Sequence, residues 1–549
     1  MIEKLLENWL DSASERSYQA VFVQMLSAQG HRVMHSTRHT VLEYGKDVIA
    51  VNPDGEWCAY QLKGTPGGKL GLTEFRSEIQ PQLIQLMSQP IVFPGYDGDH
   101  HRSFLVNNGE YQEEVIRAVD DLNRNPSLTS KVTLIARGDL LDWCKRFGVA
   151  LWPSELEDTK ALLELFLSDP KDTLPIEKLS TLLEQILSLR EKDTRKVNSQ
   201  EFERRVTSAA LLTGIATSAF AESENHLAII SAWTLFLVTA IASIERHQKR
   251  SKGAVERTMA LAEAAIGDSL AMLWQEVQDK PDLVEGSPLA EPEVRGWRHT
   301  TLVGLLSTLA FHDERACYLD PETRKRLDAW LRLPPVACEI WGEAAVAPLA
   351  TWVYWLLFHG EQTKAKTELL AIATTLIERN HPKSSSALAS PYYTWQEVIA
   401  KIIGPNCEGW SPVMGKEAFA GNSYMAEPIF HMLVRLGMKK ECKDLWRLFS
   451  ILGHHVCLHD EPWQFCVLKM PTGANQTRIY PATYSWEVLQ EEAHAASPTN
   501  TPELMHSKPL LQSLWWQVAP YRFTSASSTL FSCAMESASG GCHSSADEG

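Results

Sequence analysis

The 549-residue sequence lacks the charge that is typical of proteins that bind nucleic acid over a broad surface. It has 52 Lys and Arg against 68 Asp and Glu, which gives a formal net charge of -16. Bulk electrostatic binding of nucleic acid requires the opposite sign. Any contact of this chain with nucleic acid is therefore expected to be local.

Several other signatures are missing. The ten cysteines form no Cys-x-x-Cys pair, and a chain of this length does not need disulfides to stabilise a core. The first residues, MIEKLLENWLDSASERS, lack the basic start and the long apolar run of a signal peptide. Nucleophile-elbow, zinc-protease and dinucleotide-binding patterns are absent as well. These absences favour a cytoplasmic protein and exclude the most easily recognised enzyme classes.

Long hydrophobic runs are scarce. Leu227–Ile244 is uncharged for 18 residues, but it is short and only weakly apolar for a membrane span. We therefore expect a buried core helix there, and a membrane partner is not expected. With 44% hydrophobic and 22% charged residues, the composition is that of an ordinary globular protein.

The periodicity of the sequence changes near residue 152. Residues 1–150 alternate helical and strand patterns, which predicts an α/β domain with a mixed sheet flanked by helices. Residues 154–523 have helical periodicity throughout and predict a large all-α helical array, with subdivisions near 190–200 and 280–290. Residues 524–549, rich in Ser, Ala and Gly, predict a disordered tail.

The excess acid is unevenly distributed. Residues 1–150 hold 15 Lys and Arg against 19 Asp and Glu, a net charge of -4, so most of the excess lies in the helical region. The first domain is thus nearly balanced in charge, whereas the chain as a whole is expected to bind DNA weakly by itself.

A β-hairpin is predicted in the first domain. Two apolar strands flank Asn52-Pro-Asp-Gly55, which has the composition of a tight turn. A three-residue loop in this turn pairs Asn52 with Glu56 and sets Asp47 opposite Gln61. Because side chains alternate along a strand, Lys63 lies on the same face of the hairpin as Asp47 and Gln61.

A carboxylate, an amide and an ammonium group are thus predicted to converge. Asp47 and Gln61 supply oxygen atoms that suit a divalent cation such as Mg²⁺ or Mn²⁺, which activates water and neutralises phosphate charge. Lys63 is then placed to assist attack on phosphorus. This combination suits metal-dependent hydrolysis of a phosphodiester bond. The structural alternative is an ordinary cross-strand ion pair between Asp47 and Lys63.

These residues resemble a known family. Glu43-Tyr-Gly-Lys-Asp47 followed by Gln61-Leu-Lys63 is similar to the Mrr-like branch of the PD-(D/E)xK restriction-endonuclease superfamily, a branch that is known for the motif Gln-x-Lys. The resemblance covers about residues 14–150. It implies a restriction-endonuclease-like fold, DNA as partner and a role in restriction or anti-phage defence.

The sequence departs from the family at one position. In the family, a helix before the hairpin carries an acid eleven residues before a glycine, and here Gln19 stands at that place before Gly30. Glu15, one helical turn earlier, and Glu43 are the candidates for the missing carboxylate.

The segment after Lys63 is rich in glycine but does not fit a phosphate-binding loop of the Walker A type, which needs one more residue and a following Ser or Thr. Lys69 and Arg76 are instead candidate contacts to the DNA backbone.

Three functions are consistent with these sequence features. The first is a Mg²⁺-dependent DNA endonuclease with a helical region that senses or regulates and that binds a protein partner; a homodimer would allow it to cut both strands. The second is a non-cleaving nuclease-like domain on an acidic interaction scaffold. RNA in place of DNA is a third, because the metal chemistry is the same.

Overall fold

The computed structural model describes residues 2–36, 46–93, 96, 98, 100–147, 156–190, 197–280, 292–316, 319–333, 340–384, 386–395, 397–398, 420–457, 459–468, 475–495 and 501–540. The chain forms two compact units, Met1–Ser269 and Leu270–Gly549. The fold is mixed α/β, with small sheets and many helices.

Unit 1 is built on a five-stranded mixed sheet in the order β1-β2-β3-β5-β7. The three strands at one side are antiparallel and the remaining pairs are parallel. The strands are β1 (Arg32–Ser36), β2 (Val48–Val51), β3 (Trp57–Lys63), β5 (Arg102–Asn107) and β7 (Val132–Ile135). A separate parallel pair joins β4 (Lys69–Leu70) to β6 (Glu110–Tyr111). This agrees with the predicted mixed sheet.

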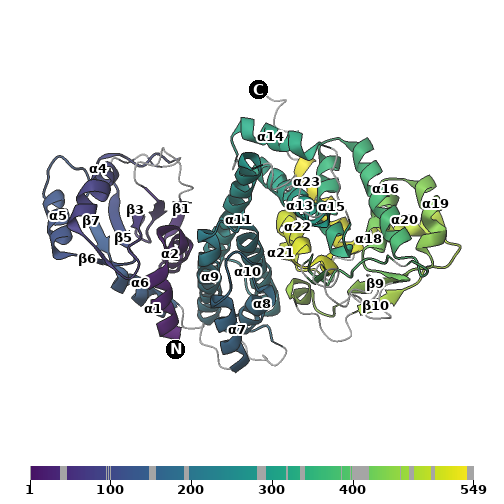
Figure 1. The fold of residues 1–549 in the computed structure, drawn as a ribbon, viewed down its shortest axis with the longest axis horizontal. Coiled ribbons are helices and arrows are strands. Elements are labelled where there is room, and N and C mark those ends of the chain that lie inside the picture. Colours follow the sequence, from purple (N-terminus) through teal and green to yellow (C-terminus); the bar gives the residue numbers. More distant parts are fainter. Residues whose placement is uncertain are drawn as a thin grey trace. The chain divides into compact units, whose positions relative to one another are not determined.

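Helices cover both faces of this sheet (Figure 1). On one face, α2 (Glu15–Ala28) and α6 (Arg137–Phe147) pack through Phe22, whose ring contacts Tyr60 of β3 and Trp143 of α6. On the other face, α4 (Gln80–Ser88) and α5 (Glu113–Asn123) close a core against β3 and β5. The alternation of side chains along β3 therefore separates two cores.

The helix that precedes β5 contains a wide turn. It begins as α3 (Leu72–Glu74), passes through a π-helical turn, η1 (Phe75–Ile79), and continues as α4. Pro81 has no N–H group to donate to the preceding turn, and a π turn is one way in which a helix accommodates such a residue.

The compact unit extends beyond the predicted boundary near residue 152. Helix α9 (Ser199–Glu222) packs on α2, where a Cβ atom at Gly214 would lie 3.0 Å from a methyl carbon of Val21. The Trp9 indole N–H also donates to Ser218 Oγ at 2.8 Å. Small residues in α9 thus allow close packing on the α/β layer, so the change in periodicity is not a boundary in packing.

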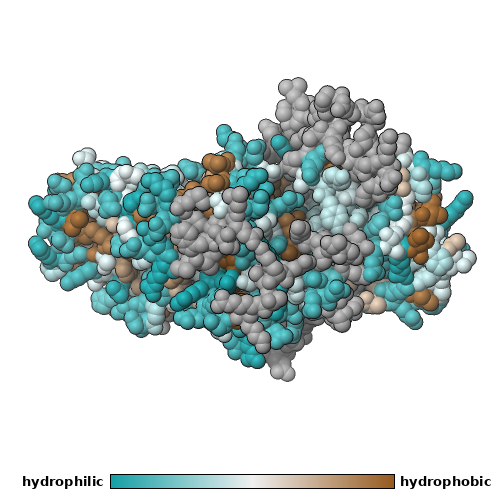
Figure 2. Space-filling model, turned by 90° about the horizontal axis from the view of Figure 1, so that it is seen from below, coloured by the Kyte–Doolittle hydropathy of each residue, from teal (hydrophilic) through white to brown (hydrophobic). Residues whose placement is uncertain are grey.

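The remaining helices of unit 1 are α1 (Ile2–Ser12), α7 (Leu156–Phe166), α8 (Ile176–Ile186) and α10 (His226–Arg246). Helix α11 (Ala254–Asp279) contains the division between the units. Among the residues that the structure describes, α10 alone is long and apolar enough to cross a membrane, but 83% of its apolar window is buried inside the protein. This is the behaviour of the core helix that the sequence predicted. Hydrophilic residues dominate the face drawn in Figure 2, and the coloured apolar residues form small separate groups.

Unit 2 is mainly helical but is not all-α as predicted. Its helices include α13 (Pro292–Ala316), α14 (Pro321–Leu331), α15 (Val346–Phe358), α16 (Gln362–Arg379), α18 (Ala426–Arg435), α19 (Lys439–Phe449), α20 (Trp486–His494), α21 (Glu503–His506) and α22 (Pro509–Val518). A three-stranded sheet, in the order β10-β9-β8, joins β10 (Asn475–Arg478), β9 (Gly453–Cys457) and β8 (Asn422–Ser423). These strands are too short for their periodicity to be distinguished from that of a helix end.

The predicted disordered tail is also corrected. Ser525–Gly540 form helix α23, and Phe531 is fully buried. The Phe531 ring contacts the rings of Phe311, Tyr354 and Trp516. The Ser528 hydroxyl contacts Tyr354 Oη, and the Arg435 guanidinium donates a hydrogen bond to the Ser528 hydroxyl. Packing by these few residues offsets a composition that by itself indicates disorder. Residues 541–549 lie outside the described part.

Candidate active site

Asp47 and the end of β3 define the candidate site. The register of β2 on β3 pairs Val48 with Tyr60 and Val51 with Trp57, as the turn at residues 52–55 predicted. The Asp47 N–H donates to the Tyr60 carbonyl at 2.9 Å. Its carboxylate accepts the Leu62 N–H at 2.6 Å. The Asp47 side chain is therefore held against the backbone of β3, next to Gln61 and Lys63.

Lys63 lies beside Glu15, the first residue of α2. The Lys63 Nζ atom is 3.5 Å from Glu15 Oε2, and the two side chains are 23% and 31% exposed. Burial raises the pKa of Glu15, the Lys63 ammonium lowers it and the Asp47 carboxylate raises it. Two carboxylates and an ammonium thus influence one another at the end of β3, which is the kind of site where catalytic groups are found.

Tyr18 fixes α2 to the end of this strand. Its side chain is 1% exposed, its hydroxyl donates to the Lys63 carbonyl at 2.9 Å and it accepts the Lys63 N–H at 3.2 Å. Gly64 permits the same close approach, because a Cβ atom there would lie 2.8 Å from the Glu15 backbone nitrogen. Tyr18 was not among the candidate residues predicted from the sequence. Its position one turn after Glu15, on the same helical face, is the signal for this positioning role.

Gln19 has a structural partner. Its Nε2 atom donates to Ser36 Oγ on β1 at 2.9 Å. Of the two candidates for the missing acid, Glu15 lies at Lys63, whereas Glu43 falls outside the described residues. Glu15 is therefore the carboxylate that the described structure brings to the site.

Gln61 is buried between β3 and α4. It is 2% exposed, and its Nε2 atom donates to Gln82 Oε1. Its own Oε1 atom is buried and has no hydrogen-bond partner among the described residues. A buried amide oxygen without a donor has a free lone pair for a cation. Gln82, which orients this amide, was not identified in the sequence.

Lys69 and Arg76 lie on β4 and η1, and both side chains are exposed. No hydrogen bond or ion pair in the described part of the chain orients either of them. They remain candidates for contact with a phosphate backbone and are separate from the buried groups of the site.

The donor set at the end of β3 suits a hard divalent cation. Asp47 and Glu15 supply carboxylate oxygens and Gln61 supplies the unpartnered amide oxygen. Oxygen ligands of this type are those that Mg²⁺ and Mn²⁺ prefer. Within the described ranges, no group of three or more His, Cys, Asp or Glu side chains is clustered tightly enough to hold a metal ion. This statement does not cover Gln61, which is an amide, or Glu43, which lies outside the described residues.

Comparison of the chain with protein-family models, with curated proteins and with solved structures gave no match.

Proposed function

We propose that the chain is a Mg²⁺- or Mn²⁺-dependent endonuclease that hydrolyses phosphodiester bonds of DNA. The observation that supports this most is the meeting of Asp47, Lys63 and Glu15 at the end of β3, with Lys63 Nζ 3.5 Å from Glu15. Carboxylates for a cation, and an ammonium for developing phosphate charge, are the groups that this hydrolysis requires.

Each residue has a distinct role in the proposal. Asp47 and Gln61 would hold the cation, and Glu15 would complete its ligands in place of the acid that Gln19 does not provide. The cation supplies charge neutralisation and an activated water. Lys63 stabilises the negative charge that develops on phosphorus, and Tyr18 holds its backbone in place.

The wider architecture supports a restriction-endonuclease-like assignment of unit 1. Its hairpin lies in a mixed sheet with helices on both faces, which is the fold that the resemblance implies. The proposal includes cleavage of foreign DNA in the cytoplasm, regulation through unit 2 by a protein partner, and a homodimer for cutting both strands.

The first test is metal-dependent cleavage of supercoiled plasmid. The wild-type protein is expected to nick DNA with Mg²⁺ or Mn²⁺ and to lose this activity in EDTA. Asp47→Asn is expected to reduce cleavage by about a hundredfold or more, because a metal ligand loses its charge while an amide oxygen can still accept the Leu62 N–H. An agarose-gel time course measures the rate, and single-stranded RNA as substrate distinguishes the RNA alternative.

The second test concerns Glu15. Glu15→Gln is expected to reduce cleavage by about ten- to a hundredfold and to raise the Mg²⁺ concentration for half-maximal rate. The reason is that the cation site loses one of its carboxylates and binds Mg²⁺ more weakly. Glu114→Gln, an exposed change on α5, is the matched control. Equal rates and equal Mg²⁺ dependence in the two variants would show that Glu15 has no part in the reaction. A wild-type protein that is folded but inactive on DNA and RNA would favour the non-cleaving scaffold.

A further inference from the structure

Unit 2 contains a cavity of about 320 Å³. Side chains from α18, β9, β10 and α20 line it, together with the segment that leads into α23. The volume lies at the lower end of the range for small-molecule sites. The polar groups on its walls decide which molecule it suits.

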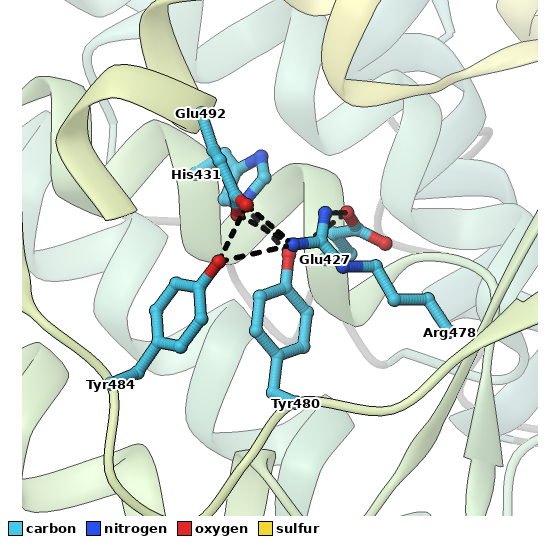
Figure 3. Close-up of polar contacts among 6 residues, drawn as sticks. All are labelled: Glu427, His431, Arg478, Tyr480, Tyr484 and Glu492. Carbon is cyan, nitrogen blue, oxygen red and sulfur yellow. Dashed lines mark hydrogen bonds and ion pairs between the residues drawn. The ribbon is translucent and has the colours of Figure 1, made fainter. Parts of the chain in front are cut away.

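On one wall, the cation is already paired with two carboxylates (Figure 3). Arg478 donates to both carboxylate oxygens of Glu492 at 2.7 Å, and its guanidinium lies 4.2 Å from the centre of the Tyr480 ring. Arg478 also lies 3.5 Å from Glu427 Oε1. The Tyr484 hydroxyl donates to Glu492 at 2.5 Å. The cation of this wall thus has its counter-charges within the protein.

His431 presents an acceptor to the same cavity. The Tyr480 hydroxyl donates to Glu427 Oε1 at 3.0 Å, so at its 3.2 Å contact with His431 Nε2 it accepts. The Nε2 atom therefore carries the proton of the neutral ring, and Nδ1 carries the lone pair. His431 is 2% exposed, and its Nδ1 has no partner among the described residues.

Arg522 is a buried cation without a counter-charge among the described residues. It lines the cavity, is 1% exposed, and forms no salt bridge with any described carboxylate. Its Nη1 contacts Cys457 Sγ at 3.2 Å and its Nη2 donates to the Val467 carbonyl at 2.6 Å, while Nε is buried and has no partner in the described part of the chain. A buried charge without compensation destabilises the fold, because the charged group has lost its hydration. An anion in the cavity would remove that destabilisation.

The amino end of α23 adjoins Arg522. Ser525 and Ala526, the first two residues of this 16-residue helix, line the cavity, and Ser525 Oγ is buried without a partner in the described structure. The first N–H groups of a helix have no acceptor within the helix, and they favour anions. Two N–H groups here are already used, since the Thr524 N–H donates to Ser527 Oγ at 2.9 Å and the Ser527 N–H donates to Thr524 Oγ1 at 3.2 Å. The N–H groups of Ser525 and Ala526 are the ones that lie at the cavity.

We propose that this cavity binds a small organic anion that also carries a hydroxyl or amino group. The phosphate or carboxylate of the ligand contacts Arg522, Ser525 and the amino end of α23, and its hydroxyl or amino group donates to His431 Nδ1. This site lies within unit 2 and does not depend on nuclease activity in unit 1.

Isothermal titration calorimetry of the full chain at low ionic strength tests the site. The probes are adenosine 5′-monophosphate and citrate, which separate phosphate from carboxylate ligands, and uncharged adenosine. At least one anionic probe is expected to bind with one site per chain, and adenosine about ten- to a hundredfold more weakly than its monophosphate. Absence of binding by both anions overturns the proposal, and so does binding of adenosine as tight as that of its monophosphate.

Two variants connect the binding to the named residues. Arg522→Met is expected to weaken binding about ten- to a hundredfold, whereas Arg447→Met, an exposed change on α19, leaves it unchanged. Ser525→Asp places a carboxylate beside Arg522, so it is expected to abolish binding of the anion and to raise the unfolding temperature. If Arg522→Met does not fold, Ser525→Asp decides. Unchanged affinity in Ser525→Asp overturns the proposal.

Discussion

Replacement of Lys63 by alanine is expected to lower the rate of plasmid cleavage by about a hundredfold to a thousandfold, the usual loss when a preorganised electrostatic group is removed from a transition state. The Lys63 Nζ atom lies 3.5 Å from Glu15 Oε2, and the Asp47 carboxylate is close to this pair. The variant is expected to remain folded. The strand at this position is held by backbone pairing with Asn107 and by the Tyr18 hydroxyl, neither of which uses the Lys63 side chain.

Steady-state kinetics separate a catalytic Lys63 from one that only binds DNA. A group that acts in the transition state lowers kcat with KM little changed, whereas loss of a contact made equally in the ground state raises KM. Lys131→Ala, an exposed change just before β7, is the matched control. Near-wild-type kcat in Lys63→Ala would reject the proposed role and leave the ion pair with Glu15 as a structural contact.

The hairpin is the part of the candidate site that could be predicted from the sequence, because the residues of its turn determine the register of its two strands. The turn at Asn52–Gly55 sets a register that is confirmed by the pairing of Val48 with Tyr60. The Asn52 side chain stabilises this turn by accepting the N–H groups of Asp54 and Glu56. Because side chains alternate along a strand, the register also placed Asp47 next to Gln61 and Lys63.

The sequence left two candidates, Glu15 and Glu43, for the carboxylate that lies beside Lys63. Helical spacing gives the face on which Glu15 lies, but its distance from Lys63 depends on how closely α2 approaches β3. That approach is set by contacts distant in sequence, namely Tyr18 on the backbone of Lys63 and the missing Cβ atom of Gly64. Gln82, on a helix with a π turn, is likewise placed by packing and not by local pattern.

Packing between distant segments also explains what the sequence analysis missed at the scale of domains. The change of periodicity near residue 152 is real, yet small residues of α9 pack on α2 and extend the compact unit. In unit 2, β8 has only two residues, so its pairing with β9 depends on tertiary contacts more than on propensity. Helix α23 is stabilised by burial of Phe531 in spite of a sequence rich in Ser and Ala.

Glu343 is expected to give the largest effect on stability in unit 2. It lies in the short helix η3 (Glu343–Ala345), is fully buried, and accepts hydrogen bonds from three groups: the Asn380 amide at 2.7 Å, the Tyr424 N–H at 2.9 Å and the Ser423 hydroxyl. Glu343→Ala leaves these donors buried without an acceptor. We expect the free energy of unfolding to fall by about 3–5 kcal/mol, measured by urea denaturation followed through tryptophan fluorescence.

The same carboxyl group gives stability a defined dependence on pH. Burial raises the pKa of Glu343 from 4.5 to about 7, while its hydrogen bonds from Ser423, Tyr424 and Asn380 lower it. Because the folded pKa lies above the unfolded one, the folded state binds more protons between about pH 4.5 and 7. The contribution of Glu343 is therefore fully present below pH 4.5 and is lost as the pH rises through 7, by about 3 kcal/mol in total.

Comparison with Glu343→Gln isolates this contribution from that of other titrating groups. Glutamine has nearly the same volume but does not ionise, so wild type is expected to lose about 3 kcal/mol more than the variant between pH 4.5 and 8. The wild type is the protein that loses stability as the pH rises, because ionisation of the buried Glu343 carboxyl destabilises the folded state. Parallel pH profiles for the two proteins would mean that Glu343 has the same pKa in the folded and unfolded chains. In that case the hydrogen bonds from its three donors would offset the effect of burial on its pKa.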